Sequence, residues 1–174
     1  MRTYEFKLKF SLPNASQEPG HFLERLGKEG CTDALVGIGQ KGRIAFLFTR
    51  GANNALDAVL SAIKNIKNAI PEATLIEAAP DLVGLSDIAE MLGYSRQNIR
   101  KLMLNNLVSF PTPIHEGKTI LWHLSSILTW AKERNRYQID ELLLDVATAN
   151  MQLNIAKESV HLDASIREQF LAGI

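Results

Sequence analysis

The chain has 174 residues, of which 46% are hydrophobic and 22% are charged, as expected of a globular protein with one or two domains. No apolar run is long enough to cross a bilayer, and the N-terminal segment MRTYEFKLKF lacks the apolar core of a signal peptide. The single cysteine, Cys31, excludes an internal disulfide and fits a reducing compartment. We therefore expect a cytoplasmic protein with no membrane partner.

The formal net charge is zero, but the charges are unevenly distributed along the chain. Residues 82–137 carry seven basic side chains against four acidic ones, a net charge of +3. Residues 138–174 carry two basic side chains against six acidic ones, a net charge of −4. Because a phosphate backbone responds to the local field, the neutral total does not exclude nucleic acid as a partner.

Residues 1–80 alternate between strand and helix patterns. Apolar residues at every second position in Tyr4–Phe10 predict a strand, and residues 19–30 predict a short helix. Two further strands, CTDALVGI and RIAFLFT, flank a glycine-containing hairpin turn. An apolar stripe with helical spacing covers residues 52–69, and ATLIEAA is the last strand. The order βαββαβ predicts an α+β domain of the ferredoxin-like type, with two helices on one face of a four-stranded antiparallel sheet.

Two motifs in this first domain are weak indicators of a ligand. Gly37–Gly42 matches G-x-G-x-x-G, but a strand follows it, whereas a dinucleotide site requires a helix there. The alternation in Arg43–Phe48 places the phenylalanines under the helices, so the open sheet face offers no aromatic ring for stacking on RNA bases. For this domain a small-molecule effector, a protein partner and a second subunit contact all stay open.

The stretch LSDIAEMLGYSRQNIRKLM, Leu85–Met103, contains two short helical patterns separated by a glycine. Where two helices cross closely, the first needs a small residue, the turn needs a left-handed backbone, and the second supplies an aliphatic side chain. Ala89, Gly93 and Ile99 meet these requirements at spacings of four and six residues. Ser95 is the expected N-cap of the second helix.

With Ile99 pointing inward, the second helix presents basic and amide side chains to the outside. Arg96, Gln97, Arg100 and Lys101 are poorly suited to packing, but they suit phosphates and base edges. An ordinary helical hairpin with a solvated outer face has the same spacing, so spacing alone does not separate the two interpretations.

The span Leu82–Lys132 resembles the AlpA and MerR type of winged helix-turn-helix, found in small bacterial and phage regulators and excisionases. The similarity continues beyond the helical pair through FPTPIHEGKTILWHLSSILTW, with its Phe-Pro-x-Pro entry, a turn at Gly117 and two tryptophans. The resemblance implies a recognition helix over Ser95–Asn106 and a wing over Ile114–Leu121. It departs from the family pattern in the wing: such wings are often rich in arginine, whereas this one offers only Lys118 and His115 beside Glu116. A closing helix is expected over residues 125–134.

We expect double-stranded DNA as the partner, with Arg96, Gln97 and Arg100 reading the major groove and the other basic residues on phosphates. The complete set of expected DNA-binding residues is Ser95, Arg96, Gln97, Asn98, Arg100, Lys101, Lys118, Lys132, Arg134 and Arg136.

Residues 138–160 are predicted to form a helix with an apolar seam that steps by three and four residues. The seam consists of Ile139, Leu142, Val146, Ala149, Leu153, Ala156 and Val160. We expect this seam to form a homodimer. The alternative, a helix packed against its own domain, is favoured by Leu143, Leu144 and Ile155, which lie off the seam.

The sequence therefore predicts three parts: a ferredoxin-like domain over 1–80, a winged helix-turn-helix over 81–137 and a dimerising helix within 138–174. Its expected function is that of a dimeric, sequence-specific transcriptional regulator. An excisionase-like or architectural DNA-binding protein and an antitoxin-like protein-interaction adaptor are the alternatives. The histidines and Cys31 show no metal-ligand spacing, and no residues indicate a catalytic site or a cofactor.

Overall fold

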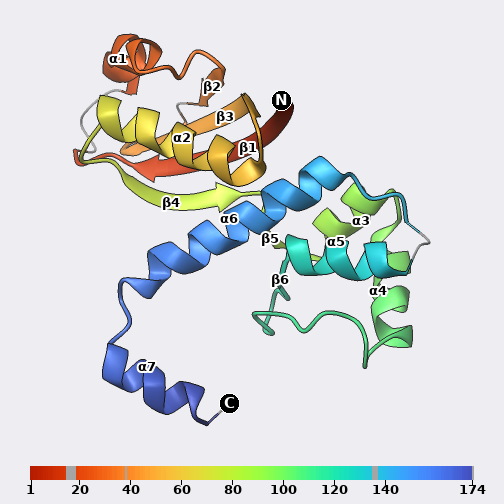
Figure 1. Cartoon of the computed structure of the whole chain (residues 1–174). Helices are drawn as coiled ribbons and strands as arrows, with labels where there is room; N and C mark the ends of the chain where they lie inside the picture. Colours follow the sequence, from red (N-terminus) through yellow and green to blue (C-terminus); the bar gives the residue numbers. More distant parts are fainter. Residues whose placement is uncertain (15–18, 38, 135–136, 174) are drawn as a thin grey trace.

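The computed structural model describes residues 1–14, 19–37, 39–134 and 137–173, and shows a mixed α/β protein with a four-stranded sheet and seven α-helices in these residues (Figure 1). The sheet has the order β2-β3-β1-β4, and every neighbouring pair is antiparallel. Its strands are β1 (Arg2–Ser11), β2 (Ala34–Gly37), β3 (Arg43–Ala52) and β4 (Thr74–Ala79). The predicted four-stranded antiparallel sheet is confirmed.

The two long strands owe their burial to the period-two pattern. β1 and β3 pair so that Phe6 lies opposite Phe48 and Leu8 opposite Phe46, and all four side chains are buried. The rings of Phe6 and Phe48 stack with centroids 5.3 Å apart. Because side chains alternate across a strand, the other face of the sheet carries charged residues, as expected.

Helices cover the apolar face of the sheet. A 3-10 turn η1 (Pro19–Phe22) leads into α1 (Leu23–Lys28), and α2 (Ala55–Ala69) follows β3. The Asn54 side chain caps α2 by accepting a hydrogen bond from the Asp57 N–H. Small and aliphatic residues of α2 then pack on the phenylalanines of the sheet.

A second, mainly helical unit follows the sheet. It contains β5 (Leu82–Val83), α3 (Leu85–Leu92), α4 (Arg96–Asn105), β6 (Trp122–His123) and α5 (Leu124–Glu133). Its separate core is built from aliphatic residues of the three helices and from Phe110, Trp122 and Trp130. The three predicted helices are present, with ends within one residue of the expected positions. The β5–β6 pair was not predicted, because two-residue strands are too short to show a period.

The long helix α6 (Glu141–Ser159) packs against both cores. Val146 and Ala149 are buried against the sheet, where Leu142 and Leu153 pack beside them. On another face of the helix, Ala147 is buried in the core of the second unit, and Leu143 and Leu144 pack against that core. Ile139, which precedes the helix, packs against the same core. A helix that is apolar on nearly all sides is expected between two layers.

This arrangement corrects the expected dimer seam. Five of the seven seam residues, Ile139, Leu142, Val146, Ala149 and Leu153, contact cores of their own chain. Only Ala156 and Val160, at the end of the helix, are exposed. The heptad pattern therefore records intramolecular packing, as the off-seam leucines had suggested.

A buried polar joint connects the sheet, α6 and the second unit. Asp81 is 2% exposed, and its carboxylate lies 2.7 Å from His123 Nδ1 and accepts a hydrogen bond from Asn154 Nδ2 at 2.7 Å. The Asn154 amide also accepts from the Ala78 N–H at 2.9 Å and donates to the Ala78 carbonyl at 2.8 Å. Asn154 thereby pairs with the edge strand β4 as a neighbouring strand would.

The chain ends in a second C-terminal helix, α7 (Ala164–Leu171), where the sequence predicted only one helix after Gln138. In Figure 1, α7 stands apart from both units at the end of the segment that follows α6. Among the described residues, no helix is both long and apolar enough to cross a bilayer.

Candidate nucleic-acid interface

The geometry of α3, the turn and α4 follows from three residues. Gly93 has φ +70°, a left-handed conformation that ends α3 and that side chains other than glycine rarely adopt. Ser95 Oγ accepts a hydrogen bond from the Asn98 N–H at 3.2 Å and so caps α4. Ile99 is 1% exposed and fills the space between the helices. The two helices, the left-handed glycine, the N-cap and the buried aliphatic side chain predicted for this stretch are therefore present.

The segment after α4 forms a small hairpin that is anchored by aromatic residues. The Ile114 N–H donates to the Leu121 carbonyl at 2.9 Å, and an antiparallel bridge joins His115 to Leu121. Trp122 Nε1 donates to the Pro111 carbonyl at 2.9 Å, and the Trp122 ring meets Phe110 edge-on. The loop between His115 and Leu121 is thereby held at a defined position opposite α4.

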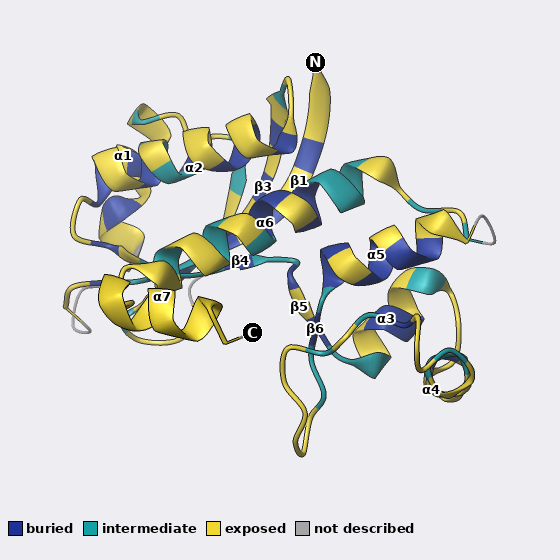
Figure 2. Cartoon of the chain, turned by 60° about the horizontal axis from the view of Figure 1, so that its bottom comes forward, coloured by how far each residue is buried: buried dark blue, intermediate teal, exposed yellow. Residues whose placement is uncertain are grey.

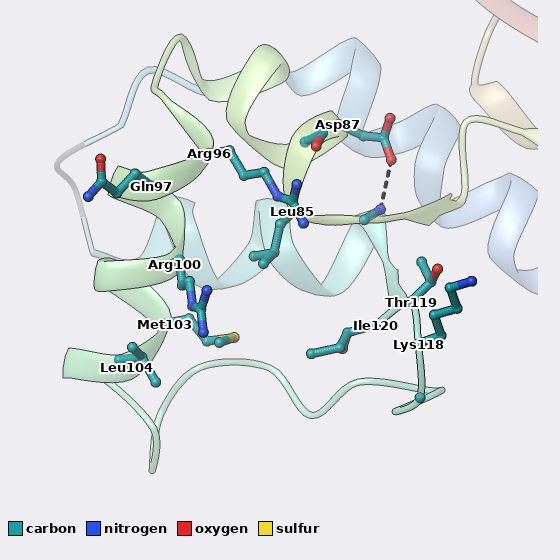
Figure 3. A pocket seen from close by; sticks show the side chains of 13 residues that line it. Leu85, Asp87, Arg96, Gln97, Arg100, Met103, Leu104, Lys118, Thr119 and Ile120 are labelled. Carbon is teal, nitrogen blue, oxygen red and sulfur yellow. Dashed lines mark hydrogen bonds between the residues drawn. The ribbon is translucent and has the colours of Figure 1, made fainter.

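A hollow of about 940 Å³ lies between α4, the N-terminus of α3 and the hairpin loop (Figure 3). Arg96 and Arg100, four residues apart on α4, both point into it, while Lys118 lies on the opposite rim. Leu85, Met103 and Ile120 add apolar surface; the other lining residues are Gly84, Ser86, Asp87, Gln97, Leu104, Gly117 and Thr119.

The hollow is electropositive on balance. Arg96, Arg100 and Lys118 are exposed, and Asp87 supplies the one carboxylate among the lining residues. That carboxylate accepts a hydrogen bond from the Gly84 N–H at 2.8 Å, which holds it at the start of α3. Three cations against one engaged carboxylate favour an anionic partner.

Other residues of α4 face away from the centre of this hollow. The side chain of Gln97 points to the far side of α4 in Figure 3. Asn98 and Lys101 line a smaller hollow of about 290 Å³ together with Tyr94 and Tyr137. The sequence placed these residues correctly on the exposed surface of α4, but it did not separate its two sides.

The basic residues of the α5 region are already engaged within the chain. Lys132 Nζ lies 2.8 Å from Glu141 Oε2, so it pairs with the first turn of α6. The Arg134 guanidinium stacks on Trp130 at 4.3 Å from the ring centroid and donates to the Ser109 hydroxyl. Neither residue lines the hollow, so their contact with phosphates stays a prediction. Arg136 lies outside the described residues.

Sequence reasoning did not find the whole lining of the hollow. Thr119 and the start of α3 lie there because the hairpin and β5–β6 bring them opposite α4, and no local pattern signals that closeness.

Among the described residues, no group of three or more His, Cys, Asp or Glu side chains could hold a metal ion.

Comparison of the chain with protein-family models, with curated proteins and with solved structures returned no match. What the candidate interface can bind is therefore inferred from its own shape and charge. Any proposed ligand has to be complementary in charge and shape to the two arginines on α4 and to the lysine across from them.

Proposed function

We propose that the chain is a sequence-specific double-stranded DNA-binding regulator of transcription, in which α4 enters the major groove. The observation that carries the proposal is that Arg96 and Arg100 point from adjacent turns of α4 into one hollow rimmed by Lys118. With ten residues, α4 is about 15 Å long, and a major groove about 12 Å wide admits such a helix.

The two arginines and the lysine have different roles in this proposal. Arg96 and Arg100 would each donate two hydrogen bonds to a guanine edge, the commonest specific contact in the major groove. Lys118 would contact a phosphate on the flanking strand, which positions the protein without reading sequence. Leu85 and Ile120 line the same hollow as these arginines, and their apolar side chains suit contact with a thymine methyl group.

We extend the proposal to the fold. The capped helical pair, the hairpin at His115–Leu121 and the tryptophan after it support a winged helix-turn-helix of the AlpA and MerR type. The strand order β2-β3-β1-β4, with α1 and α2 at the two crossovers, supports a ferredoxin-like arrangement for the sheet. A regulator that binds two DNA half-sites needs two copies of the DNA-binding unit, so the active species is a homodimer.

The proposal is tested by gel shift against pooled fragments of the native genome over a range of salt concentrations. Arg96→Ala with Arg100→Ala should weaken specific binding by about 1–3 kcal/mol per arginine and relax the sequence preference. The matched control removes two exposed arginines from the sheet unit, Arg25→Ala with Arg43→Ala, and should bind nearly as the unaltered chain does. A folded Arg96/Arg100 variant with unchanged affinity would refute the interface.

A further inference from the structure

The helix α7 is an apolar surface without a partner in its own chain. Ile166 is 51% exposed, Phe170 69% and Leu171 55%, and no residue of α7 is buried, all eight being described. Figure 2 shows the helix exposed along its whole length. An isolated helix shorter than about 12 residues is marginal in water, so α7 requires an apolar surface to stay folded.

A groove of about 840 Å³ lies at the joint between β4, β5, the start of the second unit and the end of α6. Its walls contain large apolar side chains that are about half exposed: Leu82 at 50%, Met91 at 41%, Ile114 at 48% and Ile155 at 50%. Large apolar side chains gathered in one exposed groove are characteristic of an interaction site. The groove and α7 are therefore two unpartnered apolar surfaces of one chain.

We infer that α7 of one copy docks in this groove of a second copy, and that the reciprocal exchange of α7 holds the protein as a dimer. A second copy is the occupant because every molecule carries both complementary surfaces, and a two-fold exchange satisfies both at once. In this structure the chain's own α7 leaves the groove open: Leu162 lies in the groove wall, α7 starts two residues later, and none of its residues lines the groove.

Charge is compatible with this docking. Arg167 and Glu168 flank the apolar residues of α7. The groove lining carries both signs, with two lysines, Lys7 and Lys157, and four acidic side chains, Glu77, Asp81, Asp87 and Glu158. The docked helix would also lie over Ile155 on α6, half of whose surface is exposed. The exchange goes beyond DNA binding, because it determines the mass of the protein in the absence of DNA.

The test measures sedimentation of the full chain and its variants over a dilution series without DNA. Phe170→Asp places a carboxylate on the apolar face of α7, and Ile155→Asp places one in the groove. Each change should weaken dimerisation by about tenfold or more. Leu60→Asp changes a residue that is 52% exposed on α2, outside the groove, and serves as the matched control with unchanged dimerisation. Melting curves check that each variant is folded, and Met91→Asp replaces Ile155→Asp if that variant unfolds.

Mixing the two variants identifies the exchange. The Ile155→Asp chain keeps an unaltered α7, and the Phe170→Asp chain keeps an unaltered groove. A one-to-one mixture should therefore form heterodimers more strongly than either variant alone dimerises, because only the heterodimer pairs an unaltered α7 with an unaltered groove. Dimerisation that survives Ile155→Asp and Met91→Asp but not Phe170→Asp would overturn the inference in favour of pairing between two α7 helices. A monomeric unaltered chain, or a dimer insensitive to all these changes, would overturn it as well.

Discussion

The joint around Asn154 makes a quantitative prediction about stability. Asn154→Ala removes three hydrogen bonds at once, two to the backbone of Ala78 and one to the Asp81 carboxylate. Ala78 is 1% exposed, so its N–H and carbonyl lose buried hydrogen bonds when the amide is removed. An unsatisfied buried group costs about 1–3 kcal/mol, and Asp81 keeps His123, so we expect a loss of about 2–4 kcal/mol in the free energy of unfolding.

The assay is urea unfolding combined with amide hydrogen exchange at Ala78. Asn154→Ala should lower the urea midpoint and speed exchange of the Ala78 amide, because the N–H loses its acceptor. Thr148→Ala is the matched control on the same helix: its exposed hydroxyl bonds only within α6, to Leu144, so the change should stay within about 0.5 kcal/mol. Equal midpoints for the two variants, with Ala78 still protected, would refute the role assigned to Asn154.

Three further predictions concern other parts of the chain. Val146→Asp places a carboxylate in the sheet core, so the free energy of unfolding should fall by on the order of 4 kcal/mol. The folded variant should keep the mass that sedimentation measures for the unaltered chain. A lower mass at unchanged stability would show instead that the apolar seam of α6 contacts a second subunit. Burial raises the pKa of the Cys31 thiol, and the residue is 5% exposed, so a thiol reagent should label it at neutral pH only after denaturant is added. Rapid labelling of the native protein would contradict that burial. The hydrogen bond from the Ser165 hydroxyl, with those from the Ile166 and Ser165 amides, lowers the pKa of Asp163 from its usual 3.8. The cap of α7 is therefore fully present above that usual value and is lost as pH falls through the lower folded value, so NMR chemical shifts of α7 should become less helical on acidification and stay helical at neutral pH.

Elements with a strong local signal could be predicted from the sequence. The alternation of Tyr4–Phe10 produced a strand, because period-two burial is a property of the strand itself. Gly93, Ser95 and Ile99 likewise placed the turn, the cap and the buried side chain of the helical pair, since each acts within a few residues of its neighbours. The exposure of Arg96 and Arg100 followed directly from the burial of Ile99.

The partners of apolar surfaces were decided only by the tertiary structure. The seam at Val146 and Ala149 would look the same in sequence whether a second chain or the chain's own sheet covered it, and the structure shows the sheet. The position of Lys118 across from Arg100, and the pairing of Asn154 with β4, also depend on segments distant in the sequence. Side-chain periodicity specifies which face of a helix or strand is apolar, but which other surface covers that face depends on contacts between distant residues, and these form only when the whole chain packs.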